Sequence, residues 1–209
     1  CGFYAIGKFV GKLLLNRAER VTDTWREVFS LHEVRHRFQR RIGLDYGGGG
    51  NIPERERVVL YWMNEADARL TGILYAFEKA ERGDKSQLQA VADDQTMINA
   101  FYKTLNQDRT NVPEAARMAM LAFLEQKSFL ADYANSTLDW IDQARKAYDP
   151  EQPATTLLSR EKLMKMGEIG YGNYMTDAVI DAFDQAFSPE NYQSLKTARA
   201  NKGGRVCRL

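Results

Sequence analysis

The chain has 209 residues, of which 44% are hydrophobic and 27% charged, and its formal net charge is +1. These values are close to the averages for soluble globular proteins, and only five prolines argue against long disordered segments. The length suffices for a full hydrophobic core, so the chain needs neither a metal nor a disulfide to fold. No apolar stretch reaches the ~18 uncharged residues that a membrane-spanning helix needs.

The charge is distributed unevenly along the chain. Residues 1–43 carry nine Lys/Arg against four Asp/Glu, and residues 193–209 carry five Lys/Arg and no acid, so each end has a net charge of +5. The middle, residues 44–192, then has a net charge of −9. A basic–acidic–basic chain can pair its ends with its middle, within one molecule or with the next copy. The alternative is that both ends simply face water.

The two cysteines, Cys1 and Cys207, lie at the two extremities of the sequence. A first residue that is Cys and not Met indicates processing, for which three routes are open. An initiator Met was removed, a lipoprotein signal was cleaved before an acylated Cys1, or an exported protein forms a Cys1–Cys207 disulfide. We expect the lipoprotein route, which places the chain at a bacterial cell envelope; the alternatives place it in the cytoplasm or in a virion.

Apolar residues at helical spacing predict a basic amphipathic N-terminal segment over residues 1–43, as one long helix or two in line. Its first twenty residues are suited either to a membrane interface or to packing into the core. The segment ends at the clearest break in the sequence, a hinge predicted over residues 44–52. Four consecutive glycines, each about 1 kcal/mol less favourable in a helix than Ala, form its centre: Gly47, Gly48, Gly49 and Gly50.

Helical periodicity continues over residues 53–202, which we expect to form a bundle domain followed by a basic tail over residues 203–209. Pro, Gly and capping residues separate the expected helices. These run from Pro53 to Gly83, Asp84 to Leu105, Pro113 to Tyr148, Ser159 to a stop near Gly167–Gly172, Thr176 to Phe187, and briefly from Pro189. No run alternates like a strand. The predicted fold class is all-α, a bundle or stacked hairpins of about six long amphipathic helices.

Residues 32–36 read His-Glu-Val-Arg-His, a formal H-E-x-x-H motif. On a helix, His32 and His36 share one face, so their imidazoles could hold a zinc ion while Glu33 activates a water. The motif thus makes His32, Glu33 and His36 the metal candidates of this sequence.

Three features of the sequence favour a solvated basic helix face over a metal site at this motif. Arg35 and Arg37 place positive charge beside it. The chain has only two histidines, so a third ligand would have to be a distant carboxylate. The strands that flank such sites in zinc proteases are missing. We therefore expect no metal, no other cofactor and no catalytic residue.

A dense basic segment surrounds Phe38, and we expect it to contact an anionic partner. Such a segment can meet the acidic middle of a neighbouring subunit or lipid headgroups. A pI near 7.9 and a single aromatic residue in the segment argue against a dedicated nucleic-acid module. Its members are Arg26, Arg35, Arg37, Arg40 and Arg41.

The sequence therefore predicts a non-enzymatic helical subunit of a larger protein assembly, lipid-anchored at a bacterial envelope through Cys1. Its expected partners are other protein subunits, including copies of itself, and membrane lipid at the N-terminus, but not nucleic acid. A virion or ejection-type structural protein that contacts nucleic acid or membrane is the first alternative. A metal-dependent hydrolase using the H-E-x-x-H motif is the second.

Overall fold

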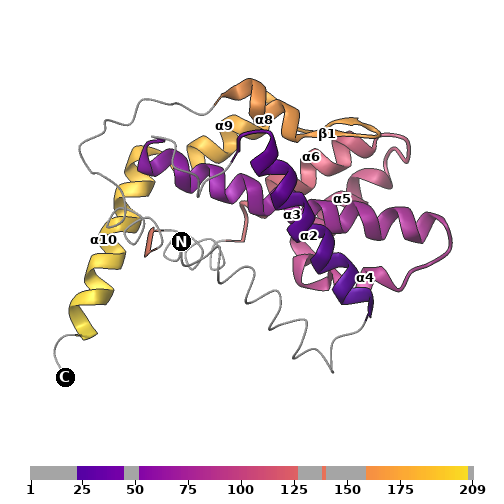
Figure 1. Cartoon of the computed structure of the whole chain (residues 1–209), viewed down its shortest axis with the longest axis horizontal. Coiled ribbons are helices and arrows are strands. Elements are labelled where there is room, and N and C mark those ends of the chain that lie inside the picture. Colours follow the sequence, from indigo (N-terminus) through magenta and orange to yellow (C-terminus); the bar gives the residue numbers. More distant parts are fainter. Residues whose placement is uncertain (1–22, 45–51, 127–137, 140–158, 207–209) are drawn as a thin grey trace.

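A computed structural model describes residues 23–44, 52–126, 138–139 and 159–206 of the chain. This part is mostly helical, which confirms the predicted all-α fold class (Figure 1). Cys1, Cys207 and the glycines of the predicted hinge lie outside the described residues. The helices are α2 (Asp23–Arg41), α3 (Glu54–Glu81), α4 (Gln87–Ala90), α5 (Gln95–Leu105), α6 (Val112–Phe123), α8 (Arg160–Met166), α9 (Asp177–Ala186) and α10 (Pro189–Val206), with a 3-10 turn η1 (Ala92–Asp94).

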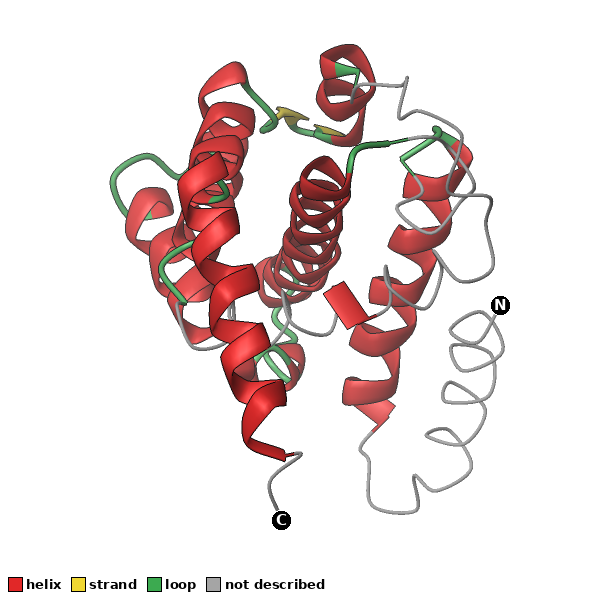
Figure 2. Ribbon diagram, turned by 90° about the vertical axis from the view of Figure 1, so that its left-hand side faces the viewer, coloured by secondary structure: helices red, strands yellow, loops and turns green. Residues whose placement is uncertain are grey.

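The long helix α3 is the centre of the fold. It begins directly after Pro53, with Glu54 and Glu56 near its positive end, and it ends where Gly83 adopts a φ of +92°. Most of its residues between Val58 and Ala76 are buried. The helices α2, α4, α6 and α9 all pack against it. Figure 2, which looks roughly along α3, shows the other helices placed around it.

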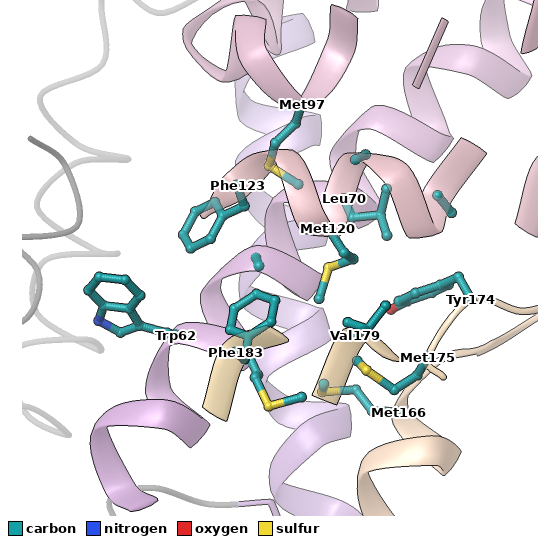
Figure 3. Close-up of a cluster of buried hydrophobic side chains, with 14 of the residues drawn as sticks. Trp62, Leu70, Met97, Met120, Phe123, Met166, Tyr174, Met175, Val179 and Phe183 are labelled. Atoms are coloured by element: carbon teal, nitrogen blue, oxygen red, sulfur yellow. The ribbon is translucent and has the colours of Figure 1, made fainter. Parts of the chain in front are cut away.

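The core is rich in methionine and aromatic side chains from several helices (Figure 3). Phe123 of α6 stacks on Phe183 of α9 with ring centroids 6.4 Å apart. Trp62 of α3 meets Phe187, which follows α9, edge to face at 4.0 Å. Flexible thioether side chains fill the irregular gaps between such rings, and the fully buried ones include Met63, Met97, Met120, Met166 and Met175.

Two of the predicted helices are shorter than the sequence suggested. The segment predicted as one helix from Asp84 to Leu105 is divided into α4, η1 and α5, because the backbone tightens after Val91, whose carbonyl accepts a hydrogen bond from the N–H of Asp94. The helix predicted to reach Tyr148 ends at Phe123, where successive i to i+3 hydrogen bonds close its last turn.

The C-terminal half also differs from the prediction in two places. A small antiparallel hairpin, β1 (Glu168–Ile169) paired with β2 (Gly172–Asn173), follows α8 although no strand was predicted. The last helix, α10, continues to Val206, past the glycines that were predicted to begin the tail. Within the described ranges, none of the helices combines the length and the apolar character needed to cross a membrane.

Candidate metal centre

Two helices bring three potential metal ligands together. His32 and His36 lie one turn apart on α2, and Glu65 lies in the middle of α3, against which α2 packs. The carboxylate is almost fully buried, with Glu65 only 6% exposed. A Cβ at Gly72 of α3 would lie 3.0 Å from Cγ1 of Val28 on α2, so this glycine allows a close approach of the two helices. Because α2 and α3 pack closely, the Glu65 carboxylate lies next to the imidazoles of His32 and His36.

The three side chains bring their donor atoms close together, with one atom from each residue within 4.8 Å of the others. Nε2 of His32 and Nε2 of His36 are 3.0 Å apart. The Glu65 carboxylate faces both rings, with Oε1 3.3 Å from His36 Nε2 and Oε2 3.6 Å from His32 Nε2. Zinc ligands lie about 2.0–2.2 Å from the ion in a tetrahedron, which separates neighbouring donor atoms by about 3.3 Å. Two imidazoles and one carboxylate at this spacing fit a zinc ion.

Burial and charge determine how these three side chains are protonated. Burial lowers the pKa of His32 to about 4, and the charge of Glu65 opposes it only in part. The pKa of His36 is raised above its ordinary value. Burial alone would lower this pKa, but the hydrogen bond and the charge of Glu65 outweigh the effect of burial. Burial raises the pKa of Glu65, yet His36, His32 and Arg69 together lower it below the ordinary value. Near neutral pH, Glu65 is therefore an anion and His32 a neutral imidazole, the forms in which they bind metals.

A buried polar cluster lies next to the ligands. Asp67 is fully buried on α3, and its carboxylate accepts hydrogen bonds from the Arg35 guanidinium at 2.8 Å and 3.0 Å. The Tyr174 hydroxyl donates to the same carboxylate. Burial, with the charge of Asp67 adding to it, raises the pKa of Tyr174, so this hydroxyl keeps its proton. Arg35 also donates to the backbone carbonyl of Met166, which ties α2 and α3 to the end of α8.

Gln39 connects this cluster to the ligands. It lies on α2 close to His36, and its side-chain amide meets Nδ1 of His36 at 2.8 Å. On its other side, the amide donates to Asp67 at 2.5 Å and to the backbone carbonyl of Asn64 at 2.9 Å. A continuous path of hydrogen bonds therefore runs from the imidazole of His36 to the buried Asp67.

Glu33, the middle acid of the motif, is exposed and lies beside the ligand face of α2. Its charge contributes to the raised pKa of His36, which indicates that the carboxylate lies near that ring. The three residues whose donor atoms converge within 4.8 Å are His32, His36 and Glu65, without Glu33. Glu33 is therefore not one of the converging donors, and its carboxylate lies beside them.

Two of the three sequence arguments against a metal at this motif, the adjacent arginines and the lack of a third ligand, have specific answers in the structure. The charge of Arg35 is neutralised by Asp67, and Arg37 is exposed on α2. The distant carboxylate that a third ligand requires is Glu65. Contact with an anionic partner stays a prediction for the other arginines of the basic segment, which are exposed or half-buried on α2: Arg26, Arg37, Arg40 and Arg41.

Sequence reasoning missed Glu65, Asp67 and Gln39. The available signal was the acidic run in the middle of α3, where Glu65 and Asp67 lie between buried apolar residues such as Met63 and Leu70. Acids at positions that helical periodicity assigns to the core must be paired or bind a cation. That signal indicates a buried polar site, although it does not reveal which residues of α2 complete it.

Comparison with known proteins adds a finding from the sequence as a whole. The model of a family described as "Putative metallopeptidase family (DUF6782)" matches residues 10–176, more than half of the chain. No curated protein and no solved structure matches the chain. The matched range includes α2 and α3, and hence every residue of the candidate metal centre.

The family match corrects the functional prediction. It points to a hydrolase, so the prediction of a structural subunit without enzymatic activity is wrong. The lipoprotein and envelope predictions that went with that function lose their support. The virion protein, as a structural alternative, is overturned with the structural subunit. The hydrolase interpretation, placed last from the sequence, is the one that the family supports. With more than half of its length matched, the chain belongs to the family described as "Putative metallopeptidase family (DUF6782)".

Proposed function

We propose that the protein is a zinc-dependent peptidase in which His32, His36 and Glu65 hold the metal and Glu33 transfers protons. The observation that carries this proposal is the close approach of the donor atoms. The two imidazole Nε2 atoms are 3.0 Å apart, and the two Glu65 oxygens lie 3.3 Å from His36 Nε2 and 3.6 Å from His32 Nε2, which is close to the spacing in a tetrahedral site. Two histidines and one glutamate form the ligand set of several zinc peptidases, in which the fourth position stays open. Membership of the family supports the same reaction class.

Each protein residue has a distinct role in this proposal. When bound, zinc supplies a Lewis acid that polarises a carbonyl group and makes water acidic enough to ionise near neutral pH. The Glu33 carboxylate accepts a proton from the water that attacks the peptide carbonyl, and it then donates that proton to the amine nitrogen released as the C–N bond breaks. Glu65 and the two imidazoles hold their positions because α2 and α3 are packed together around them.

The first experiment measures the metal content of the purified full chain and its hydrolysis of casein and of a mixed fluorogenic peptide library. Iron is measured beside zinc, since two histidines and one carboxylate also hold iron in some non-haem enzymes. We expect one zinc per chain and measurable cleavage that a chelator abolishes. The variants His32→Ala and His36→Ala should lose both the zinc and the activity.

Glu33→Gln separates proton transfer from metal binding. This variant should keep its zinc and lose about 10²- to 10⁴-fold in peptide hydrolysis, the range typical of a missing general base. The matched control is Glu161→Gln, an exposed glutamate of α8, which should cleave like the wild type. A wild-type chain that binds no zinc, or a Glu33→Gln variant as active as the control, would refute the proposal.

A further inference from the structure

Gln39 is a buried amide whose orientation is fixed by its neighbours. It is 1% exposed, and its Nε2 lies 2.9 Å from the carbonyl oxygen of Asn64 and 2.5 Å from Oδ2 of Asp67. A backbone carbonyl only accepts hydrogen bonds, and the Asp67 carboxylate, which already accepts from Arg35, does the same. An amide turned the other way would place its oxygen against two acceptors. The NH₂ group therefore faces Asn64 and Asp67, with both of its hydrogens used.

The orientation of the Gln39 amide determines which of its atoms faces Nδ1 of His36. The remaining amide atom, Gln39 Oε1, lies 2.8 Å from His36 Nδ1 and has only lone pairs to offer. Nδ1 of His36 must therefore carry a proton. A neutral imidazole has a single N–H, so Nε2 of His36 is left with a free lone pair on the side of His32 and Glu65.

Without Gln39, a different proton position would be favoured. Glu65 Oε1 lies 3.3 Å from His36 Nε2 and is a second acceptor for the same imidazole. A neutral His36 ring that donated a hydrogen bond to Glu65 would carry its N–H at Nε2, where a metal ion needs a lone pair. The two acceptors therefore compete, and the shorter contact belongs to Gln39.

We propose that Gln39 is a positioning residue that selects the Nδ1–H tautomer of His36 and thereby presents Nε2 as a metal ligand, with Asp67 and Asn64 holding the amide in place. The metal-binding half of this inference rests on the proposed function, whereas the tautomer does not. Groups that orient a ligating histidine through its second nitrogen typically change metal affinity by about 10- to 100-fold when they are removed.

The test uses the full-length chain without metal, above the raised pKa of His36, so that the ring is neutral. Because the sequence contains only two histidines, their ring nitrogens can be assigned in a long-range ¹H–¹⁵N spectrum. We expect the wild-type His36 to show protonated Nδ1 and unprotonated Nε2. The reverse pattern would overturn the proposal without any variant, and therefore independently of how a substitution affects folding.

Gln39→Met keeps the length of the side chain and removes the acceptor. This variant should show a mixture of His36 tautomers and bind zinc about 10- to 100-fold more weakly in competition with a chelator. The matched control is Gln87→Met, because Gln87 is also a buried glutamine but donates to Glu27, away from the ligands. The control should keep the wild-type tautomer and zinc affinity.

The outcomes separate this inference from the proposed function. If Gln39→Met keeps both the tautomer and the zinc affinity of the Gln87→Met control, Gln39 has no positioning role, while the zinc site stands. If the wild type binds no zinc, the proposed function fails, while the tautomer spectra still support or refute the role of Gln39.

Discussion

Oε1 of Glu65 lies 3.3 Å from Nε2 of His36, across the contact between the two longest described helices that meet at the site, α3 and α2. The carboxylate is buried among apolar residues of α3, where an anion is stable only with a positive partner. In the metal-free protein this partner is the imidazole of His36. In the proposed enzyme the metal ion takes its place.

Glu65→Gln should therefore weaken zinc binding by at least about 100-fold, beyond the typical effect of groups that only orient a ligand. The amide preserves the shape of the side chain but removes the charge. Zinc affinity is measured by competition with a chelator. The control is Glu81→Gln, an exposed glutamate at the end of the same helix; equal affinities of the two variants would exclude Glu65 as a ligand.

The helices were predictable because their signals are local. Pro53 and Gly83 bracket α3, and the side chains of Ser159 and Thr176 cap α8 and α9 by accepting from backbone N–H groups three residues ahead. The break between α4 and α5 was not predictable from periodicity. Val91, at the break, is buried, as are Gln87 four residues before it and Asp94 three residues after it, so the helical spacing of buried positions continues through the 3-10 turn.

The candidate site was predictable only in part, for a related reason. His32, Glu33 and His36 form a motif that can be recognised along one helix, whereas Glu65 and Gln39 acquire their roles from the packing of α2 on α3. Helical periodicity can mark Glu65 as an acid at a core position, but it does not show which residues of α2 face it.

Arg35 should be a structural residue and not part of a basic binding surface. It balances the charge of Asp67, which is 0% exposed. Removing one partner of a buried ion pair typically costs about 3–5 kcal/mol of unfolding free energy. We expect this loss for Arg35→Met in urea unfolding. Arg37→Met removes an exposed neighbour and should change the unfolding free energy by about 0.5 kcal/mol or less. Similar losses in both variants would contradict the assignment.

The pKa of His32 predicts how the metal-free protein responds to acid. Its value is about 4 in the folded chain against an ordinary value of 6.5, chiefly because the ring is buried. Between these two pH values the unfolded chain binds more protons, so the unfolding free energy falls as the pH falls through this window. The shift corresponds to about 3 kcal/mol at most. The contribution of His32 to the unfolding free energy is therefore fully present above pH 6.5 and is lost as the pH falls to about 4.

The pKa values of the other two ligands are shifted in opposite directions, so their contributions to the unfolding free energy change at opposite ends of this window. The pKa of His36 is raised, so its stabilisation is present below the ordinary value of 6.5 and lost as the pH rises through the folded pKa. The pKa of Glu65 is lowered from 4.5, so its stabilisation is lost only as the pH falls through the folded value. Urea unfolding of the chelator-treated protein, repeated at several pH values between 4 and 6.5, should show an unfolding free energy that falls as the pH falls. The variant His32→Gln should lack this pH dependence. An equal pH dependence in both proteins would contradict this account.

Gly167, at the end of α8, should tolerate no side chain. Its backbone has an ordinary φ of −78°, so alanine would meet no conformational penalty there. A Cβ at Gly167 would, however, lie 2.3 Å from Cβ and 2.4 Å from the backbone nitrogen of Met175. Because one of these atoms is backbone, the segment after the hairpin must move. Tyr174, which donates its backbone N–H to Gly167 at 3.2 Å and its hydroxyl to Asp67, lies on that segment.

Gly167→Ala should therefore lower the unfolding free energy by about 1–3 kcal/mol, the usual effect of overpacking, and loosen Tyr174 from Asp67. Gly170→Ala provides the control, because a Cβ at this position of the hairpin meets no atom within 4 Å. The control should be as stable as the wild type in urea. Since the same atom is added in both variants, the contacts with Met175 and with Oδ1 of Asn173, which also lies 2.3 Å from the added Cβ, distinguish them. Equal stability of the two would show that this turn can move away from α8 without disturbing the buried cluster beside the metal ligands.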